Sequence, residues 1–148
     1  MSDQVILALI KWGVLLMWAL WMSLVTAYNL ADALKALGRL PATVRSSSNL
    51  ALIRTTTASI RVPEAVIWLM FWGVIVWELI ASVLLWWAVL GGGLGVATAA
   101  LGLSLLLWAA FVLVNQLFMT WLTEPGVVTA HRDLFAITAL SLLLLRLL

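Results

Sequence analysis

The chain contains no cysteine. This absence excludes disulfide bonds, a thiolate nucleophile, iron–sulfur clusters held by cysteine and zinc sites built from cysteine. Histidine occurs once, at His131, and a single histidine cannot supply both axial ligands of a membrane haem or all the ligands of a zinc site. Metal or haem binding at His131 would therefore need a partner's ligand, and we expect an interfacial residue at a helix start instead.

Charge is also scarce. Asp, Glu, Lys and Arg make up 9% of the 148 residues, whereas 66% are hydrophobic. A soluble domain needs polar side chains over its surface, but a bilayer accepts leucine and tryptophan on the outside. With a mean hydropathy of +1.19, the composition predicts an all-α membrane protein with a single transmembrane domain over residues 1–148. The net charge of +2 then indicates orientation and lipid contacts rather than nucleic-acid binding.

Apolar stretches predict four transmembrane helices, at about residues 5–28, 65–90, 94–122 and 131–148. Gly91, Gly92 and Gly93 form a turn too short for a domain, which predicts a hairpin of the second and third helices. The fourth stretch gives only about 22 Å of helix from Leu134, unless the helix begins near Thr129.

The polar loop 29–64 separates the first two stretches and contains five basic residues, Lys35, Arg39, Arg45, Arg54 and Arg61. By the positive-inside rule this loop is cytoplasmic, which predicts both termini outside, in a bacterial inner membrane. Apolar residues at helical spacing (Leu30, Leu34, Leu37) predict one short interfacial helix, and the segment after 46–49 predicts a second.

Glu78 lies near the middle of the second stretch. An acid there costs roughly 3 kcal/mol or more if it faces lipid, so we expect it to face protein or water. At about 1.5 Å per residue, Lys11 and Arg146 lie at a similar depth and are its predicted partners. The structural interpretation is an internal ion pair, or a protonated Glu78 hydrogen-bonded to the backbone. The functional interpretation is a proton or ion pathway, or contact with a larger membrane partner.

Two further groups in the third stretch admit more than one interpretation. Asn115 and Gln116, near its cytoplasmic end, form hydrogen bonds between helices or bind a quinone or a lipid headgroup. Gly95, Ala99 and Gly102 place small residues along one side, which permits close packing within the chain or dimerisation.

Tryptophan is abundant, with ten residues. Trp68 and Trp72 are one turn apart, so we expect them to share a face that packs against protein, lipid tails or a pigment. The chain offers no nucleophile–base–acid set and no closely spaced pair of carboxylates, which predicts a protein that is not an enzyme.

The order of motifs resembles a bacterial family of predicted small integral membrane proteins, the domain of unknown function 2165 family. Asn29 and Asp32 resemble its Asn-x-x-Asp motif, and Glu78 resembles its acid within the second span. The segment 116–121, with Phe118, Met119 and Trp121, resembles its Glu-Trp-Phe-x-Met-Trp run, although Gln116 replaces the acid. Phe135 near Arg132 resembles a pair before the last span, and the family's His-Val-Leu-Ser-Met-Asp element is missing. The resemblance implies four helices and no established role.

These observations favour a non-catalytic accessory or scaffolding subunit of a larger membrane complex, for example a respiratory or photosynthetic one. The partners would then be other integral membrane subunits and lipids. One alternative is a small oligomeric transporter or channel that uses Glu78. A second is a membrane anchor that binds haem or quinone. No cofactor is required by the sequence, and contact with lipid, quinone, haem or pigment is compatible with it.

Overall fold

The computed structural model describes residues 2–147, apart from the side chain of Trp121, and these residues form helices and turns with no strand. Three helical segments are long and apolar enough to cross a membrane: Asp3–Ala36, Glu64–Leu117 and Pro125–Leu147. The second bends back on itself at Gly91, whose φ is 113°. The longer helices are α1 (Asp3–Ala36), α2 (Asn49–Thr57), α3 (Glu64–Trp87), α4 (Gly93–Leu117) and α5 (Pro125–Leu147). Among residues 2–147 there are also three short turns of helix: η1 (Ala58–Ile60), η2 (Ala88–Gly92) and η3 (Thr120–Leu122).

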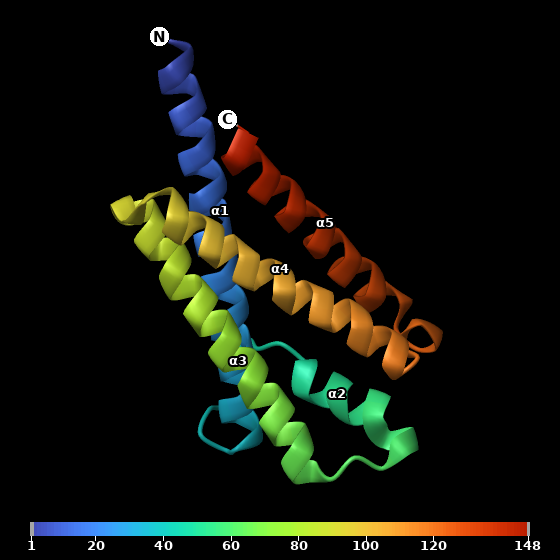
Figure 1. Cartoon of the computed structure of the whole chain (residues 1–148). Coiled ribbons are helices and arrows are strands. Elements are labelled where there is room, and N and C mark those ends of the chain that lie inside the picture. Colours follow the sequence, from blue (N-terminus) through green and yellow to red (C-terminus); the bar gives the residue numbers. More distant parts are fainter. Residues whose placement is uncertain (1, 148) are drawn as a thin grey trace.

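The long helices pack as antiparallel neighbours in chain order. Helix α1 contacts α3, α3 contacts α4, and α4 contacts α5. Both labelled termini lie at one end of the molecule in Figure 1, and α2 lies toward the other end, beside the start of α3. The loop between α1 and α3 and the turn between α4 and α5 therefore share one end of the bundle.

The first helix is longer than the sequence predicted. No separate short helix forms around Leu30 and Leu34, because α1 continues through both to Ala36. It stops where Gly38 adopts a φ of 68°, a conformation that glycine takes without strain. The second predicted short helix is present as α2.

The ends of the other helices follow local backbone chemistry. Helix α3 begins directly after Pro63, as predicted, and the glycines at 91–93 make the predicted turn. Helix α4 ends at Leu117 rather than 122, because Met119 adopts a left-handed φ of 51°. Helix α5 begins at Pro125 rather than 131, and its 23 residues extend about 34 Å, which removes the predicted shortfall in length.

The main core lies where α1, α3, α4 and α5 meet. Trp18 and Met22 of α1, Leu85 of α3, Leu101 of α4 and Leu145 of α5 are all nearly inaccessible. The small residues of α4 that enter this core are Ala97, Ala100 and Ser104.

The predicted stripe of small residues lies elsewhere. Gly95 and Ala99 are exposed and Gly102 is only half-buried. An added Cβ at either glycine would meet nothing within 4 Å. The stripe therefore does not pack closely against another helix of the chain. The small residues of α4 that are buried, Ala97, Ala100 and Ser104, lie on a different face.

Three tryptophans, one buried and two half-buried, join helices through their indole N–H groups. Trp18 Nε1 donates to Ser141 Oγ of α5 at 2.9 Å, and Trp86 Nε1 donates to Ser23 Oγ of α1 at 2.9 Å. Trp77 Nε1 donates to a backbone carbonyl of α4 at 3.0 Å. Such bonds between helices contribute about 0.6–2 kcal/mol each in a membrane protein.

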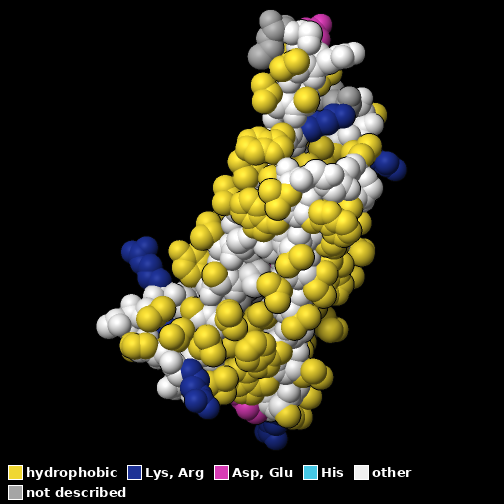
Figure 2. Space-filling model, turned by 90° about the vertical axis from the view of Figure 1, so that its left-hand side faces the viewer, with side chains coloured by type: hydrophobic (Ala, Val, Ile, Leu, Met, Phe, Trp, Pro, Cys, Tyr) yellow, Lys and Arg dark blue, Asp and Glu magenta, His cyan; other side chains and the backbone are white. Residues whose placement is uncertain are grey.

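The surface is largely apolar. Figure 2 shows hydrophobic side chains over the middle of one face, with Lys and Arg side chains toward its margins. In the most apolar 18-residue stretch of α5 only 11% of the residues are buried inside the protein, so most of its apolar side chains point outward. An outward apolar surface of this extent fits a lipid environment.

The hairpin turn yields a stability prediction. Gly91→Val should lower the free energy of unfolding by about 1–3 kcal/mol, because a β-branched residue is strained at a φ of 113°. Gly95→Ala, in open space within α4, should be neutral or slightly stabilising. Unfolding titrations in mixed micelles measure both, and equal stability of the two variants would contradict the role of Gly91.

Candidate functional site

A chain of hydrogen-bonded polar side chains joins three helices, with Glu78 and Asn29 buried and Asn49 exposed. Glu78 of α3 is 1% exposed, and Asn29 Nδ2 of α1 donates to both of its carboxyl oxygens at 2.9 Å. Asn29 Oδ1 in turn accepts from Asn49 Nδ2 of α2 at 2.7 Å. The Glu78–Asn29–Asn49 chain therefore gives the acid hydrogen-bond donors inside the protein, as a buried carboxyl group requires.

The predicted partners Lys11 and Arg146 do not form an ion pair with Glu78. Because α1 continues to Ala36 and α5 starts at Pro125, Lys11 and Arg146 lie about 38 Å and 32 Å along their helices from the loop end. Glu78 lies only about 21 Å from the start of α3. Lys11 is half-buried and Arg146 is exposed. Within the described part of the chain the one ion pair joins Arg54 and Glu64, at the surface.

Asp32 fixes the start of α2. Its Oδ2 accepts from the backbone N–H of Leu50 at 3.0 Å and from Ser47 Oγ at 3.1 Å. The first N–H groups of a helix lack hydrogen-bond partners within the helix, and the Asp32 carboxylate supplies an acceptor for one of them. Its negative charge also interacts favourably with the positive end of the dipole of α2. Asn29 and Asp32 are three residues apart, on one face of α1, and together they hold the first turn of α2 against it.

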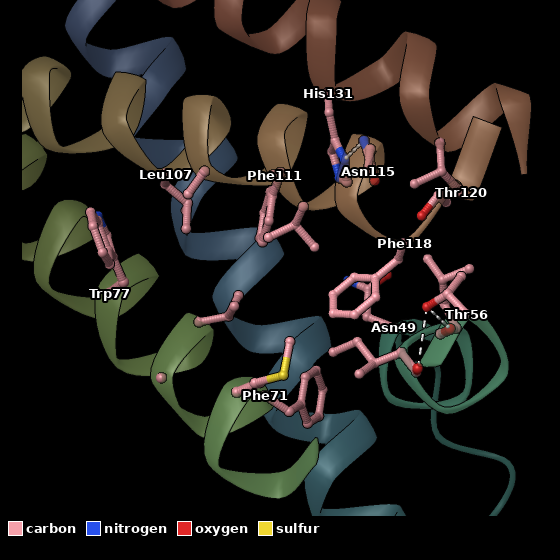
Figure 3. Close-up of a pocket in the computed structure, with 18 residues that line it drawn as sticks. Asn49, Thr56, Phe71, Trp77, Leu107, Phe111, Asn115, Phe118, Thr120 and His131 are labelled. Atoms are coloured by element: carbon pink, nitrogen blue, oxygen red, sulfur yellow. Dashed lines mark hydrogen bonds between the residues drawn. The ribbon is translucent and has the colours of Figure 1, made fainter. Parts of the chain in front are cut away.

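Next to this chain lies an apolar pocket of about 330 Å³ between α2, α3, α4 and α5. Figure 3 shows its labelled side chains converging from these helices and from the turn after α4. The lining residues are Asn49, Leu52, Ile53, Thr56, Met70, Phe71, Gly73, Val74, Trp77, Leu107, Ala110, Phe111, Val114, Asn115, Phe118, Thr120, Val127 and His131. None of them is Asp, Glu, Lys or Arg, so the pocket carries no fixed charge.

Two polar side chains meet in the wall of this pocket. Asn115 Nδ2 lies 2.9 Å from His131 Nδ1, so the two residues join α4 to α5. The His131 ring stacks on Phe111, with ring centroids 4.7 Å apart and an interplanar angle of 27°. Figure 3 shows His131 and Asn115 side by side, next to Phe111. Asn115 therefore forms the predicted hydrogen bond between helices and also lines the pocket.

The remaining residues of segment 116–121 divide between the pocket and the surface. Phe118 lines the pocket, whereas Gln116 and Met119 are exposed and do not. The side chain of Trp121 lies outside the described residues. This segment does not form a single site.

Trp68 and Trp72 differ in their surroundings. Trp68 is half-buried, and the Arg54 guanidinium lies 5.8 Å from its ring centroid. Trp72 is 36% exposed on the outer surface. Neither lines the pocket, so the predicted shared face divides between a contact with α2 and a surface position.

The described residues contain no group of three or more His, Asp or Glu side chains that could hold a metal ion. His131 has Asn115 and Phe111 as neighbours instead. Comparison with known proteins gives no further guide, because no protein-family model, no curated protein and no solved structure matches the chain. The resemblance to the domain of unknown function 2165 family therefore stays a prediction.

Sequence reasoning did not predict the pocket. Its walls include Asn49 and Phe71, which no motif singled out, and the pairing of Asn115 with His131 was also missed. One signal was present: both residues are polar and lie near the ends of consecutive apolar stretches that meet at a single turn. Residues so placed on antiparallel helices lie at similar depth.

The Glu78–Asn29–Asn49 chain predicts a non-additive pair of substitutions. Asn29→Leu should destabilise the fold by about 3 kcal/mol, because it leaves a buried carboxyl group without a donor. Glu78→Leu should cost about 1–3 kcal/mol, because the Asn29 amide then loses its acceptor. The double variant removes both polar groups and should be more stable than Asn29→Leu alone. Unfolding titrations of all four proteins test this, and strict additivity would show that the two side chains do not interact.

Proposed function

We propose that the chain is a non-catalytic membrane protein with four spans that binds a lipid-soluble molecule in the pocket between α2, α3, α4 and α5. The observation that carries the proposal is the pocket itself, an uncharged cavity of about 330 Å³ with a polar pair in its wall. Small-molecule sites are typically apolar clefts of about 300–1,000 Å³ with a few convergent polar groups. The pocket has both properties.

Helix lengths support the proposal of four spans. α3 has 24 residues and α4 has 25, so each extends about 36 Å and exceeds the roughly 30 Å of a bilayer's hydrocarbon core. The turn at Gly91 reverses the chain between them. α1 and α5 are also long enough to cross. Basic residues are concentrated between α1 and α3, so the positive-inside rule favours a cytoplasmic loop and both termini outside in the proposed arrangement.

Such a protein would act as an accessory or scaffolding subunit of a larger membrane complex, which is the role predicted from the sequence, and ligand binding would bring it close to the alternative of a membrane anchor. The pocket supports the alternative of a quinone-binding anchor more directly than that of a haem-binding one. Donation from Asn115 to His131 Nδ1 leaves the proton on Nε2, where a haem ligand needs a lone pair, and a haem would also need a second axial ligand. The transporter alternative has less support, since Glu78 is 1% exposed and both its oxygens already accept from Asn29.

The four-span arrangement is testable with single cysteines, because the chain has none of its own. Ser48→Cys and Glu124→Cys should react with an impermeant maleimide from one side of oriented vesicles. Ser2→Cys and Leu90→Cys should react from the other side only, since all four positions are exposed. Labelling of the Leu90 variant from the same side as the Ser48 variant would show that α3 and α4 do not each cross.

Pocket binding is testable by filling the cavity. Gly73 lines the pocket, and a Cβ there would meet nothing within 4 Å, so Gly73→Leu should fold and occupy the space. We expect it to weaken binding of 2-decyl-1,4-benzoquinone or decylbenzene by about tenfold or more, measured as partition into lipid nanodiscs with and without protein. Gly13→Leu is the matched control, since Gly13 also lies in a helix with nothing within 4 Å but does not line the pocket. Equal loss in both variants, or no binding by the unmodified protein, would refute the proposal.

A further inference from the structure

We infer that the pocket takes a neutral, flat ring that carries a carbonyl oxygen, the chemistry of a quinone, and that His131 Nε2–H donates a hydrogen bond to that oxygen. This inference rests on the proposed function and names the class of ligand for the same site.

The Asn115–His131 contact determines which ring nitrogen carries the proton. With the Asn115 amide nitrogen turned toward the ring, 2.9 Å from His131 Nδ1, we assign Asn115 as the donor and His131 Nδ1 as the acceptor, which carries no proton. The proton of the imidazole is then on Nε2. Among the described residues no side chain or carbonyl accepts a hydrogen bond from Nε2, so this N–H is free for a ligand. Asn115 is thus a positioning residue that sets the tautomer of His131.

The pocket walls favour a ring over an open chain. Three of the chain's four phenylalanines, Phe71, Phe111 and Phe118, line this one pocket, and Trp77 joins them. Figure 3 shows these four aromatic side chains arranged around the cavity. Offset or edge-to-face contacts between aromatic rings add about 0.5–1.5 kcal/mol beyond area burial. Flat rings therefore gain more here than an acyl chain of equal volume.

The charge and polarity of the lining favour a neutral ligand with one polar end. No lining residue carries a carboxylate, ammonium or guanidinium group to pair with an ion. Polar lining residues, including Asn49, Thr56 and Asn115, come from α2 and the last turns of α4, whereas Leu107 and Trp77 lie farther from that end. A ring with its carbonyl toward His131 and its apolar substituent toward Trp77 matches this gradient.

The test compares three probes that share a ten-carbon chain: 2-decyl-1,4-benzoquinone, decylbenzene and monodecanoylglycerol. Partition into protein-loaded nanodiscs is measured for the unmodified protein, His131→Phe and His131→Gln. The unmodified protein should prefer the quinone to decylbenzene by about three- to tenfold, the worth of one neutral hydrogen bond. His131→Phe keeps a ring against Phe111 but has no donor, so it should lose this preference and still bind decylbenzene. His131→Gln supplies a side-chain N–H₂ and should retain part of it.

Each other outcome decides against the inference in its own way. An unchanged preference in His131→Phe would show that His131 is not the donor. Equal binding of quinone and decylbenzene by the unmodified protein would show that the pocket binds apolar molecules without recognising a carbonyl group on the ring, which overturns the inference. Stronger binding of monodecanoylglycerol would also overturn it, because the acceptor would then be an ester. Binding of no probe would instead refute the proposed function. If His131→Phe does not fold, the infrared carbonyl band of the bound quinone decides: a shift to lower frequency than in empty nanodiscs supports the hydrogen bond, and an unshifted band overturns it.

Discussion

The interaction on which the arrangement of this protein depends is the hydrogen bonding of one side-chain amide, that of Asn29. A carboxyl group inside an apolar bundle is tolerated only where donors reach it, and Asn29 reaches both oxygens of Glu78. The carbonyl of the same amide accepts from Asn49, so the group that satisfies the acid also fixes the start of α2. Hydrogen bonds of the Asn29 side chain thereby connect α1, α2 and α3.

The position of α2 then determines the shape of the pocket. Asp32 caps this short helix, and Leu50 of α2 packs in a small apolar cluster with Ala33 of α1 and Phe71 of α3. A helix of nine residues is marginal by itself, so these contacts with α1 and α3 account for its stability. Once held there, α2 presents Asn49 and Ile53 to the space between α3, α4 and α5, and the cavity acquires its fourth wall.

Much of the fold was predictable because apolar runs and turn residues act locally. Pro63 and the glycines at 91–93 mark helix boundaries through backbone constraints that do not depend on tertiary contacts. The partner of Glu78 was not predictable by depth arithmetic, since that estimate needed the true ends of α1 and α5. The sequence prediction ended the first helix near residue 28, so Asn29 was assigned to the loop and was not considered as a partner of Glu78. The pocket is lined by side chains from four helices. A local sequence pattern cannot predict where the packing of four helices leaves a cavity.

The place of Asn49 in both the polar chain and the pocket wall has a thermodynamic consequence. A molecule that stabilises one orientation of the Asn49 side chain also changes the free energy of the hydrogen bond to Asn29, and through it the environment of Glu78. Linkage makes this effect reciprocal: whatever free energy the occupied pocket adds to the Asn29 contact, that contact adds to occupancy. Any molecule that the pocket binds would therefore share one coupled equilibrium with the acid inside the bundle, through a single residue of the shortest α-helix.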